Sequence, residues 1–374
     1  MRLPERLKAL GMGAGNMNAK TDSAYKFGCG RYIQQHGALD LAGREARRLG
    51  NHALILGGSN TLPLVRKKLT DSLAAAACTH ACFEYGGPCS EEAAQQYAAI
   101  CTEQRFDLVI GAGGGRIMDL AKLTAALAGL PVMNIPTSSA TCAAYTPLSV
   151  IYTPEGQARG SWYLEQEVAC ILADMDILCA QPRRLAFAGI MDASAKHVEI
   201  AYHLRHGLTK AADTQSAAVL AKTLYDQLIS ANMAHFDRES DTACWNMVYL
   251  CIAVTGMISG LARGAFQSAL GHAFYEAVRT MWPRESASAL HGEIVAVGLL
   301  IQETLDEQTA SLRELRDFMT AAQMPTTLHE LGLPTATSDV GALLELPFFS
   351  PYADSGREKC LEKAVYTLLS YEGR

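Results

Sequence analysis

Three side chains that divalent metals favour stand on separate predicted helices in the second half of the chain. Asp192 lies in GIMDASAKHVE, His272 in SALGHAFYE and His291 in ALHGEIVAVG. One carboxylate and two imidazoles would leave a divalent ion with open coordination positions, as catalytic sites require. Helix bundles gather such ligands from facing helices, so their separation in sequence is no obstacle. Ten histidines also allow chance groupings of surface residues, and the residues alone leave both interpretations open.

A glycine-rich turn in the first half has the composition of a phosphate-binding loop. In DLVIGAGGGRIMDLAK (residues 107–122), four glycines separate an apolar strand from the start of a helix. Without a Cβ atom, backbone N–H groups can approach an anion closely, and the helix dipole adds positive potential. The spacing matches neither GxGxxG nor a Walker loop with its Lys-Ser/Thr pair. A flexible turn between strand and helix is the simpler alternative.

The elements expected to position these groups differ between the two halves of the chain. Strand-like apolar runs stand at residues 52–58, 106–114, 132–137 and 170–178. Helical patterns alternate with them, which predicts an α/β, Rossmann-like domain with a covered parallel sheet. After Pro182 the chain is rich in Ala and Leu at helical spacing, which predicts an all-α domain. The change of composition places the boundary between domains of residues 1–180 and 181–374, with a cleft between them.

The composition excludes several classes of protein. With 49% hydrophobic residues and a net charge of -6, and no basic run longer than Arg66–Lys68, the chain predicts neither a nucleic acid nor a membrane partner. No stretch of about 20 apolar residues and no signal peptide is evident, so we expect a cytoplasmic protein. Eleven irregularly spaced cysteines predict reduced, buried thiols. Cys78, His80 and Cys82, expected on a helix, lack a second cluster to complete a metal site.

From about Ala24 onward the chain resembles the glycerol dehydrogenase-like branch of the metal-dependent, or iron-containing, alcohol dehydrogenase family. The resemblance rests on KFGCGRYIQQHGALDLAG (26–43), GAGGGRIMDLAK (111–122), PTSSATCAAYTPLSVIYTPEG (136–156), GIMDASAKHVE (189–199) and HGEIVAVG (291–298). Within that branch, ATCAAYTPLSV (140–150) and MPTTLHEL (324–331) are most similar to the bacterial hydroxycarboxylate dehydrogenase A group. That similarity implies reduction of short 2-oxo acids with NADPH.

The resemblance also implies roles for individual residues. It places Asp192, His272 and His291 at the metal, with zinc as the first choice and iron, nickel or manganese as alternatives. It places the glycines of the loop at the pyrophosphate of NADP or NAD. The expected cofactor-binding residues are Gly58, Ser59, Gly113, Gly114, Gly115, Asp119, Thr137, Ser138, Thr146, Leu148, Val150 and Tyr152. A homo-oligomer, either dimer or octamer, is expected.

Departures from the family pattern indicate an anionic substrate. Cys142 stands where glycerol dehydrogenases carry an aspartate, and a carboxylate there would repel a carboxylate-bearing substrate. Lys196 replaces a histidine ligand of the iron-using relatives, so we expect three metal ligands. One helical turn after Asp192, Lys196 could contact a substrate carboxylate, or it could form an ordinary i,i+4 ion pair with Asp192. Arg263 and Arg116 are further candidates for substrate contacts.

The preference for the cofactor is predicted from the turn after the strand at 52–58. An acidic side chain there commonly binds the adenosine ribose of NAD and repels the 2′-phosphate of NADP. Gly58 and Ser59 offer no carboxylate at this turn. We therefore expect NADPH to be accepted and preferred over NADH, with Arg66 or Lys67 as a basic partner for the phosphate.

A mechanism follows from the charges of these groups. A divalent ion would polarise the substrate carbonyl while the nicotinamide delivers a hydride. The proton source is open among a metal-bound water, Tyr145 and the cofactor ribose. Tyr275 stands where glycerol dehydrogenases repeat a histidine, so any role of that histidine is lost. The alternatives are an NAD-dependent glycerol or polyol dehydrogenase, a dehydroquinate synthase-like lyase and a non-catalytic nucleotide-binding protein.

Overall fold

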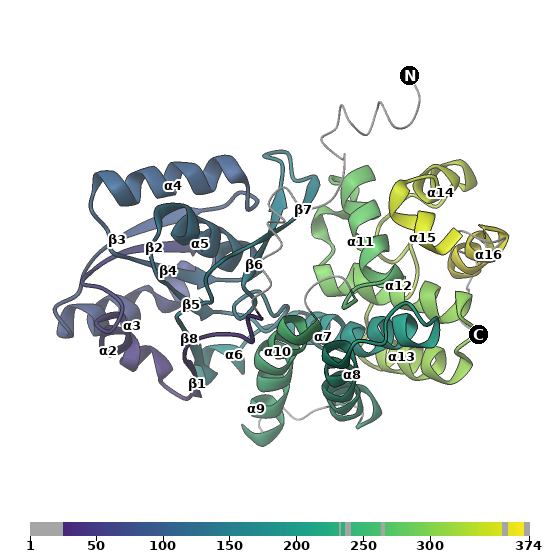
Figure 1. Cartoon of the computed structure of the whole chain (residues 1–374), viewed down its shortest axis with the longest axis horizontal. Coiled ribbons are helices and arrows are strands. Elements are labelled where there is room, and N and C mark those ends of the chain that lie inside the picture. Colours follow the sequence, from purple (N-terminus) through teal and green to yellow (C-terminus); the bar gives the residue numbers. More distant parts are fainter. Residues whose placement is uncertain (1–24, 232, 236–240, 263–265, 354–357, 370–374) are drawn as a thin grey trace. The chain divides into compact units, whose positions relative to one another are not determined.

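The computed structural model describes residues 25–231, 233–235, 241–262, 266–353 and 358–369 (Figure 1). Contacts divide them into two units. The first holds the residues up to Ser138 together with Ala143–Ala180, and the second holds Ser139–Cys142 and the residues from Gln181 onward. The short segment that contains Cys142 therefore packs with the helical half of the chain, although the expected boundary at residue 180 assigns it to the first domain.

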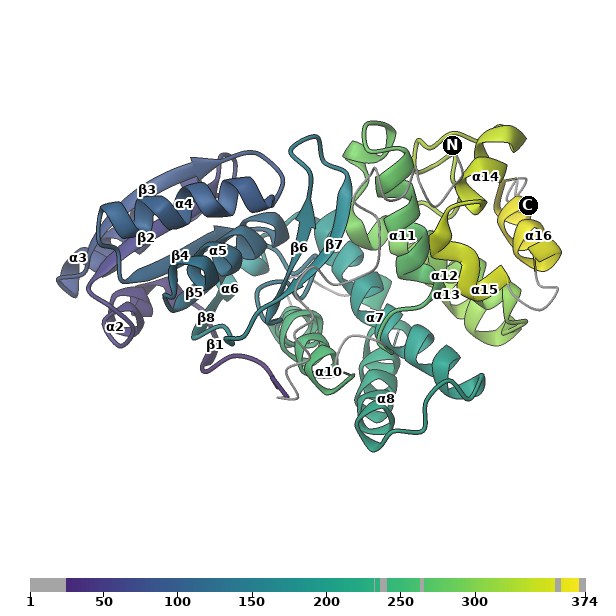
Figure 2. The same cartoon turned by 45° about the horizontal axis from the view of Figure 1, so that its top comes forward.

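The first unit is built on a parallel sheet of six strands, in the order β1-β8-β5-β4-β2-β3. The strands are β1 (Tyr32–Gln35), β2 (His52–Gly58), β3 (Thr79–Tyr85), β4 (Leu108–Gly113), β5 (Val132–Pro136) and β8 (Cys170–Asp174). The helices are α2 (Ala42–Ala46), α3 (Leu62–Ala75), α4 (Glu91–Glu103), α5 (Gly115–Ala128) and α6 (Met175–Leu178), with a 3-10 turn η1 (Ala38–Leu41). Helices α4 and α5 cover one face of the sheet, and α2 and α3 cover the other (Figures 1 and 2). This confirms the predicted α/β domain.

Apolar spacing explains why these elements form. Leu62, Val65, Leu69 and Leu73 repeat at helical spacing on α3 and are fully buried. They pack in one cluster with alternate residues of β2 and β4, such as Ile55. Burial of each large apolar side chain stabilises the fold by roughly 1.5–3 kcal/mol before the entropy of ordering is subtracted.

The predicted strand at 170–178 is wrong in its second half. Strand β8 ends at Asp174, and residues 175–178 form the single helical turn α6. The Asp174 side chain causes this change, because its Oδ1 accepts a hydrogen bond from the N–H of Asp176 at 3.0 Å and caps the turn. Its Oδ2 accepts a second bond from the N–H of Leu39, at 2.9 Å. The side chain therefore ties the end of β8 to η1.

Several strands are not among the sequence predictions. Besides β1 and β3, the first unit has an antiparallel hairpin of β6 (Leu148–Tyr152) and β7 (Ala158–Tyr163). The expectation that Cys78, His80 and Cys82 line a helix is wrong, because β3 begins at Thr79 and lies at the edge of the sheet. An edge strand is partly exposed on both faces, so its apolar alternation is weak.

The second unit is helical, and its described residues contain no strand, which agrees with the predicted all-α domain. Its longer helices are α7 (Arg183–Arg205), α8 (Ala212–Tyr225), α9 (Asp241–Tyr249), α10 (Thr255–Ala262), α11 (Leu270–Met281), α12 (His291–Leu305), α13 (Thr309–Ala321), α14 (Thr337–Leu344) and α16 (Glu358–Leu369). Shorter turns are η2 (Asp226–Ser230), η3 (Met233–His235), η4 (Leu250–Val254), η5 (Glu285–Ser288), η6 (Pro347–Phe349) and α15 (Ser350–Ala353). Helices α7, α11 and α12 pack together and carry the three candidate metal ligands.

One stretch corrects the expectation that no segment is apolar enough for a membrane helix. Thr242–Ala262, which runs through α9, η4 and α10, meets the requirements of length and composition for a membrane-spanning helix. An 18-residue window of this stretch has a mean hydropathy of 1.5. Within the fold, 67% of that window is buried, as is typical of a core helix.

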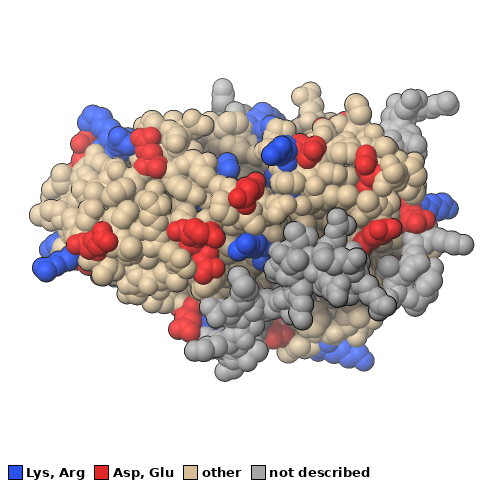
Figure 3. Space-filling model, turned by 90° about the horizontal axis from the view of Figure 1, so that it is seen from above, with Lys and Arg blue, Asp and Glu red and all other residues tan. Residues whose placement is uncertain are grey.

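On the face seen in Figure 3, Lys and Arg side chains are interspersed with Asp and Glu side chains.

The cysteines follow the prediction only in part. Cys89 and Cys251 are buried free thiols, as expected. Cys179 and Cys244 are disulfide-bonded, so the prediction of reduced thiols is wrong for these two. Irregular spacing along the chain contains no information about which thiols come together in space.

Candidate functional site

Glycines allow the three ligand-bearing helices to approach one another closely. A Cβ atom on Gly298 of α12 would lie 2.7 Å from the carbonyl oxygen of Gly271 on α11. A Cβ atom on Gly292, also on α12, would overlap with the carbonyl oxygen of Ala188 on α7. Helix α12 therefore contacts both neighbours backbone to backbone, and His291 begins α12 beside the closer of these contacts.

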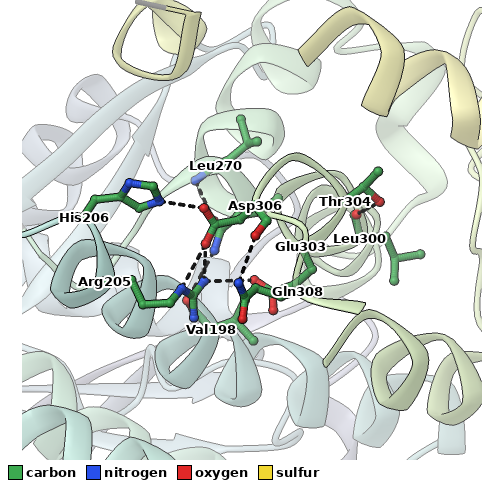
Figure 4. Close-up of polar contacts among 10 residues, drawn as sticks. Val198, Arg205, His206, Leu270, Leu300, Glu303, Thr304, Asp306 and Gln308 are labelled. Atoms are coloured by element: carbon green, nitrogen blue, oxygen red, sulfur yellow. Dashed lines mark hydrogen bonds and ion pairs between the residues drawn. The ribbon is translucent and has the colours of Figure 1, made fainter. Parts of the chain in front are cut away.

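Polar contacts hold the same three helices together. Gln302 of α12 accepts a hydrogen bond from the N–H of Leu270 at 3.0 Å. The amide of Gln302 donates to the carbonyl of Val198 on α7, at 3.3 Å. At the end of α7, Arg205 pairs with Asp306 at 2.6 Å (Figure 4). The two bonds of Gln302 are buried and the Arg205 pair is exposed, and together they fix the register of α7, α11 and α12.

The structure brings Asp192, His272 and His291 together. One ligand atom from each lies within 4.8 Å of the other two. Oδ1 of Asp192 is 3.0 Å from Nε2 of His291 and 3.7 Å from Nε2 of His272. Asp192 is buried, whereas both imidazoles are partly exposed. One carboxylate and two imidazole nitrogens that converge from three rigid helices fit a divalent ion with positions left for substrate.

The charges of the cluster shift its pKa values. Burial alone would raise the pKa of Asp192, but the charges of His291 and His272 and their hydrogen bonds lower it below its usual range. Burial alone would lower the pKa of His272, but Glu199 and Asp192 raise it to about 9. The cluster therefore retains an anionic carboxylate at neutral pH, as a cation site requires.

Glu199 belongs to this cluster and is absent from the sequence predictions. It is fully buried on α7, and its Oε2 lies 2.5 Å from Nδ1 of His272. Its spacing offered a signal, because Asp192, Lys196 and Glu199 stand at i, i+4 and i+7 and share one face of a helix. A buried carboxylate two turns after a candidate ligand can contact the next ligand.

Lys196 lies beside the cluster, and no ion pair holds it within the part of the chain that the structure describes. Its side chain is 5% exposed, and its charge affects the pKa values of Glu199 and His272. Among the described residues it forms no ion pair with Asp192, which was the alternative that the sequence left open. A buried ammonium group costs free energy unless an anion compensates it, so this position suits an anionic ligand.

Cys142 lies near the same cluster. The segment Ser139–Cys142 packs against α7, where a Cβ atom on Gly189 would overlap with the carbonyl oxygen of Ser139. The pKa of Cys251 in η4 is raised first by burial and then by Asp192 and Cys142, so both groups lie close to this thiol. Cys142 itself is partly exposed and remains accessible to a ligand.

The remaining candidates in the helical half have different outcomes. Tyr275 packs edge-on against His291, with ring centroids 4.2 Å apart, and Arg279 lies 5.6 Å from the Tyr275 ring. Tyr275 therefore packs against the imidazole of His291, and its side chain has no nitrogen that could bind a metal. Arg263 lies outside the described residues, so its role stays a prediction.

The glycine loop joins the ends of three parallel strands. Gly113 ends β4, Gly114 is the N-cap of α5, and Gly115 begins that helix. The carbonyl of Gly113 accepts a bond from the N–H of Thr137 at 2.9 Å, and a Cβ atom on Gly113 would lie 3.0 Å from Oγ1 of Thr61. The turns after β2, β4 and β5 therefore meet at the carboxyl edge of the sheet, where α/β folds bind nucleotides.

Strand β6 turns the predicted cofactor residues to one face. Leu148, Val150 and Tyr152 are partly exposed, whereas Ser149 and Ile151 between them are buried. The Ser149 hydroxyl donates to the carbonyl of Asp119 on α5 at 2.8 Å and ties the strand to that helix. Leu148, Val150 and Tyr152 therefore share the partly exposed face of the strand, and their contact with the cofactor stays a prediction.

A buried lysine fixes this arrangement. Nζ of Lys122 lies 2.9 Å from Oδ1 of Asp119, donates to the carbonyl of Thr146 at 2.9 Å and also donates to that of Leu148. Two predicted cofactor residues, Asp119 and Thr146, are themselves buried. Lys122 contacts the carboxylate of Asp119 and the backbone carbonyl of Thr146, so it ties these two residues together, and their role at the cofactor stays a prediction.

The turn after β2 carries no acidic side chain, as predicted. Strand β2 ends at Gly58, and Ser59 follows it. Both proposed basic partners are already paired, because Arg66 lies 2.6 Å from Glu84 and Lys67 lies 2.6 Å from Asp71. A 2′-phosphate at this turn would have to displace one of these exposed ion pairs. Arg116, in the first turn of α5, is exposed beside the loop.

Tyr145, the candidate proton relay, is buried and lies against Gly28, close to the first residue that the structure describes. Its ring occupies the place that a Cβ atom on Gly28 would take. Gly28 has a φ of 151°, a backbone conformation that other residues rarely adopt. Ser138 lies within 3.8 Å of the position of a Cβ atom on Gly114, next to the loop.

Known proteins share both the sequence pattern and the fold. The family model described as iron-containing alcohol dehydrogenase matches residues 29–176. Hydroxycarboxylate dehydrogenase A of Escherichia coli K12 is 32% identical over 285 residues, which cover 75% of this chain and 77% of that protein. Glycerol dehydrogenase of Thermotoga maritima is 28% identical over 318 residues, which cover 81% and 84%.

A solved structure agrees with these matches. The glycerol dehydrogenase of Schizosaccharomyces pombe matches with a TM-score of 0.77 at 25% identity, over 92% of this chain and 90% of that one. The similarity therefore extends well beyond the residues that the family model matches, and it confirms the resemblance that the sequence motifs indicated.

Proposed function

The chain belongs to the iron-containing alcohol dehydrogenase family, and on this premise we propose that it reduces short 2-oxo carboxylic acids to 2-hydroxy acids with NAD(P)H. Membership of the family implies an oxidoreductase that uses a nicotinamide cofactor and a divalent metal. The proposal goes further by naming the substrate class. It is supported above all by Lys196, a buried lysine beside the candidate metal cluster that forms no ion pair within the described part of the chain.

The residues of the chain would divide the work as follows. Asp192, His272 and His291 would hold the metal, and Lys196 would bind the substrate carboxylate and orient its neighbouring carbonyl. Cys142 would leave room for that carboxylate without repelling it. When bound, the metal supplies Lewis acidity and the reduced nicotinamide supplies the hydride.

Further parts of the proposal rest on the family pattern and on the turn after β2. Zinc is the first choice of metal, because three nitrogen and oxygen ligands with an open position suit zinc, and Lys196 stands where iron-using relatives carry a fourth ligand. NADPH is the preferred cofactor, because Gly58 and Ser59 carry no carboxylate. A cytoplasmic homo-oligomer completes the proposal.

An NAD-dependent glycerol or polyol dehydrogenase is the second candidate. The name of the Thermotoga maritima relative favours it. Absorbance at 340 nm distinguishes the two, with zinc-loaded protein, NADPH or NADH, and either pyruvate or hydroxyacetone as substrate. These substrates share a methyl ketone and differ only in carboxylate against hydroxymethyl. Preference for NADPH with pyruvate supports the proposal, and activity confined to NADH with hydroxyacetone overturns it.

Replacement of Lys196 tests the carboxylate contact directly. A charge-assisted hydrogen bond contributes about 1.5–3 kcal/mol, so Lys196→Met should lower kcat/KM for pyruvate by about 10- to 150-fold. The effect on hydroxyacetone should be much smaller. Lys210→Met is the matched control, because Lys210 is exposed. An equal loss on both substrates would mean that Lys196 does not recognise the carboxylate.

A further inference from the structure

Helix α7 buries a line of polar side chains. Asp192, Lys196, Glu199 and His203 stand at i, i+4, i+7 and i+11, and each is less than 9% exposed. Such a line is costly inside a protein unless its members have specific partners. Two of these four side chains, Glu199 and His203, have partners at the start of α11, the helix that carries His272.

Glu199 caps α11 from outside that helix. The N-cap of α11 is Ala269, whose side chain cannot accept a hydrogen bond. Instead, Oε1 of Glu199 accepts bonds from the N–H groups of Ala269 at 2.7 Å and His272 at 2.9 Å. His203 adds a third contact, because its Nε2 donates to the carbonyl of Ser268 at 2.9 Å.

The second oxygen of Glu199 reaches the imidazole. Oε2 lies 2.5 Å from Nδ1 of His272, and because a carboxylate only accepts, Nδ1 must carry the proton. The opposite nitrogen, Nε2, then faces Asp192, and it is this nitrogen that gives up its proton when a metal binds. Gly271 makes room for this arrangement, since a Cβ atom there would lie 3.1 Å from Oε1 of Glu199.

We propose that Glu199 is a positioning residue for the metal site, which sets the tautomer and the ring orientation of His272 so that Nε2 is presented to the ion. The inference rests on the metal ligands assigned in the proposed function. A ligating histidine commonly donates its other N–H to a carboxylate, and loss of that partner typically weakens metal binding by about 10- to 100-fold. Glu199 thus connects the fold of α11 to the chemistry of the cluster.

Glu199→Gln separates this role from helix capping. The glutamine oxygen can still accept the two backbone bonds at the start of α11. Its amide nitrogen then faces Nδ1 of His272, where two donors would meet, so the imidazole must turn or shift its proton to Nε2. The opposite amide orientation would place the NH2 group against both backbone donors and is disfavoured.

Glu276→Gln is the matched control. Glu276 lies one turn after His272 on α11, and its charge interacts with that imidazole. It makes no hydrogen bond to His272 among the described residues. The two variants therefore each remove one nearby carboxylate, but only Glu199→Gln removes a bond to the ring.

The test measures zinc binding by competition with a chelator in the full-length wild type and both variants. We expect the dissociation constant to rise by about 10- to 100-fold in Glu199→Gln and by less than about threefold in Glu276→Gln. The thermal unfolding midpoints of the metal-free wild type and variants should differ little, so that the loss of zinc affinity is not a loss of folding. With cobalt in place of zinc, the visible spectrum of Glu199→Gln should differ from that of the wild type.

Unchanged zinc affinity in Glu199→Gln, with a wild type that binds zinc, would overturn the inference and leave Glu199 as a helix cap. If Glu199→Gln does not fold, Glu199→Asp takes its place, because the shorter chain cannot span the same bonds, and it must weaken zinc binding likewise. A wild type that binds neither zinc nor cobalt is a different result. It would overturn the metal assignment of the proposed function and this inference with it.

Discussion

Replacement of Lys122 by methionine tests how the cofactor-binding unit is held together. The ammonium group of Lys122 is completely buried, 2.9 Å from the Asp119 carboxylate and bonded to the carbonyls of Thr146 and Leu148. Methionine has a similar length, so the packing changes little. Removal of a buried counter-charge costs about 3–5 kcal/mol, and each carbonyl that loses its donor adds about 1 kcal/mol. The sum reaches the lower end of the stability of a whole domain.

Thermal unfolding followed by circular dichroism measures this loss. At about 2–4 °C per kcal/mol, the transition of the α/β unit in Lys122→Met should fall by about 10 °C or more. Adding Asp119→Asn should restore part of the loss, because no unpaired charge then stays buried. Lys67→Met, at an exposed i,i+4 ion pair, should leave the midpoint within about 2 °C. Purely additive losses in the double variant would refute the reasoning.

Three further predictions concern the helical unit. Burial, with a smaller effect of Lys222, lowers the pKa of His197 to about 4 from its ordinary 6.5. Between these two pKa values the unfolded state therefore binds more protons than the folded state. The free energy of unfolding should fall by up to about 3 kcal/mol as the pH drops from 6.5 to 4. Denaturation at each pH measures this fall, which should be smaller in His197→Phe. Gly292→Ala should destabilise the protein by about 1–3 kcal/mol and weaken zinc binding, because the added Cβ atom displaces α12. Gly341→Ala is the control and should do neither, because Gly341 has open space around it. Equal calorimetric unfolding midpoints for the two variants would contradict this. Cys142→Asp should lower the preference for pyruvate over hydroxyacetone by at least about tenfold in kinetic assays, and an unchanged ratio would remove Cys142 from the substrate site.

Local chemistry explains which parts of the fold could be predicted. The strand, glycine loop and helix at 107–122 follow from apolar composition and from residues that lack a Cβ atom. The run at 170–178 was misjudged because apolar periodicity cannot separate a buried strand from a helical turn, and the capping bond of Asp174 decided the outcome. Strands β1 and β3 were missed because their side chains are largely half-exposed, so they lack a clear apolar pattern.

The residue types of the candidate site could be predicted from the sequence, but the contacts that hold these residues in place could not. Asp192, His272 and His291 are visible as ligand types, yet their convergence depends on glycine contacts between helices that are far apart in sequence. Glu199 stands on the same helix face as Asp192, but its partners lie about 70 residues away, at the start of α11. Sequence spacing shows such a carboxylate and does not show what it binds.

The charges around the cluster provide an argument for a monoanionic substrate. Asp192 and Glu199 carry two negative charges and Lys196 carries one positive charge, so these three buried residues sum to -1. A divalent ion with neutral imidazoles would bring the sum to +1, and burial raises the pKa of Glu276, which opposes a further negative charge there. A 2-oxo carboxylate would neutralise the site, whereas an uncharged polyol would leave a net positive charge buried, which is unfavourable. The same count explains the expected effect of Cys142→Asp, because an added carboxylate would supply the negative charge that the substrate otherwise brings.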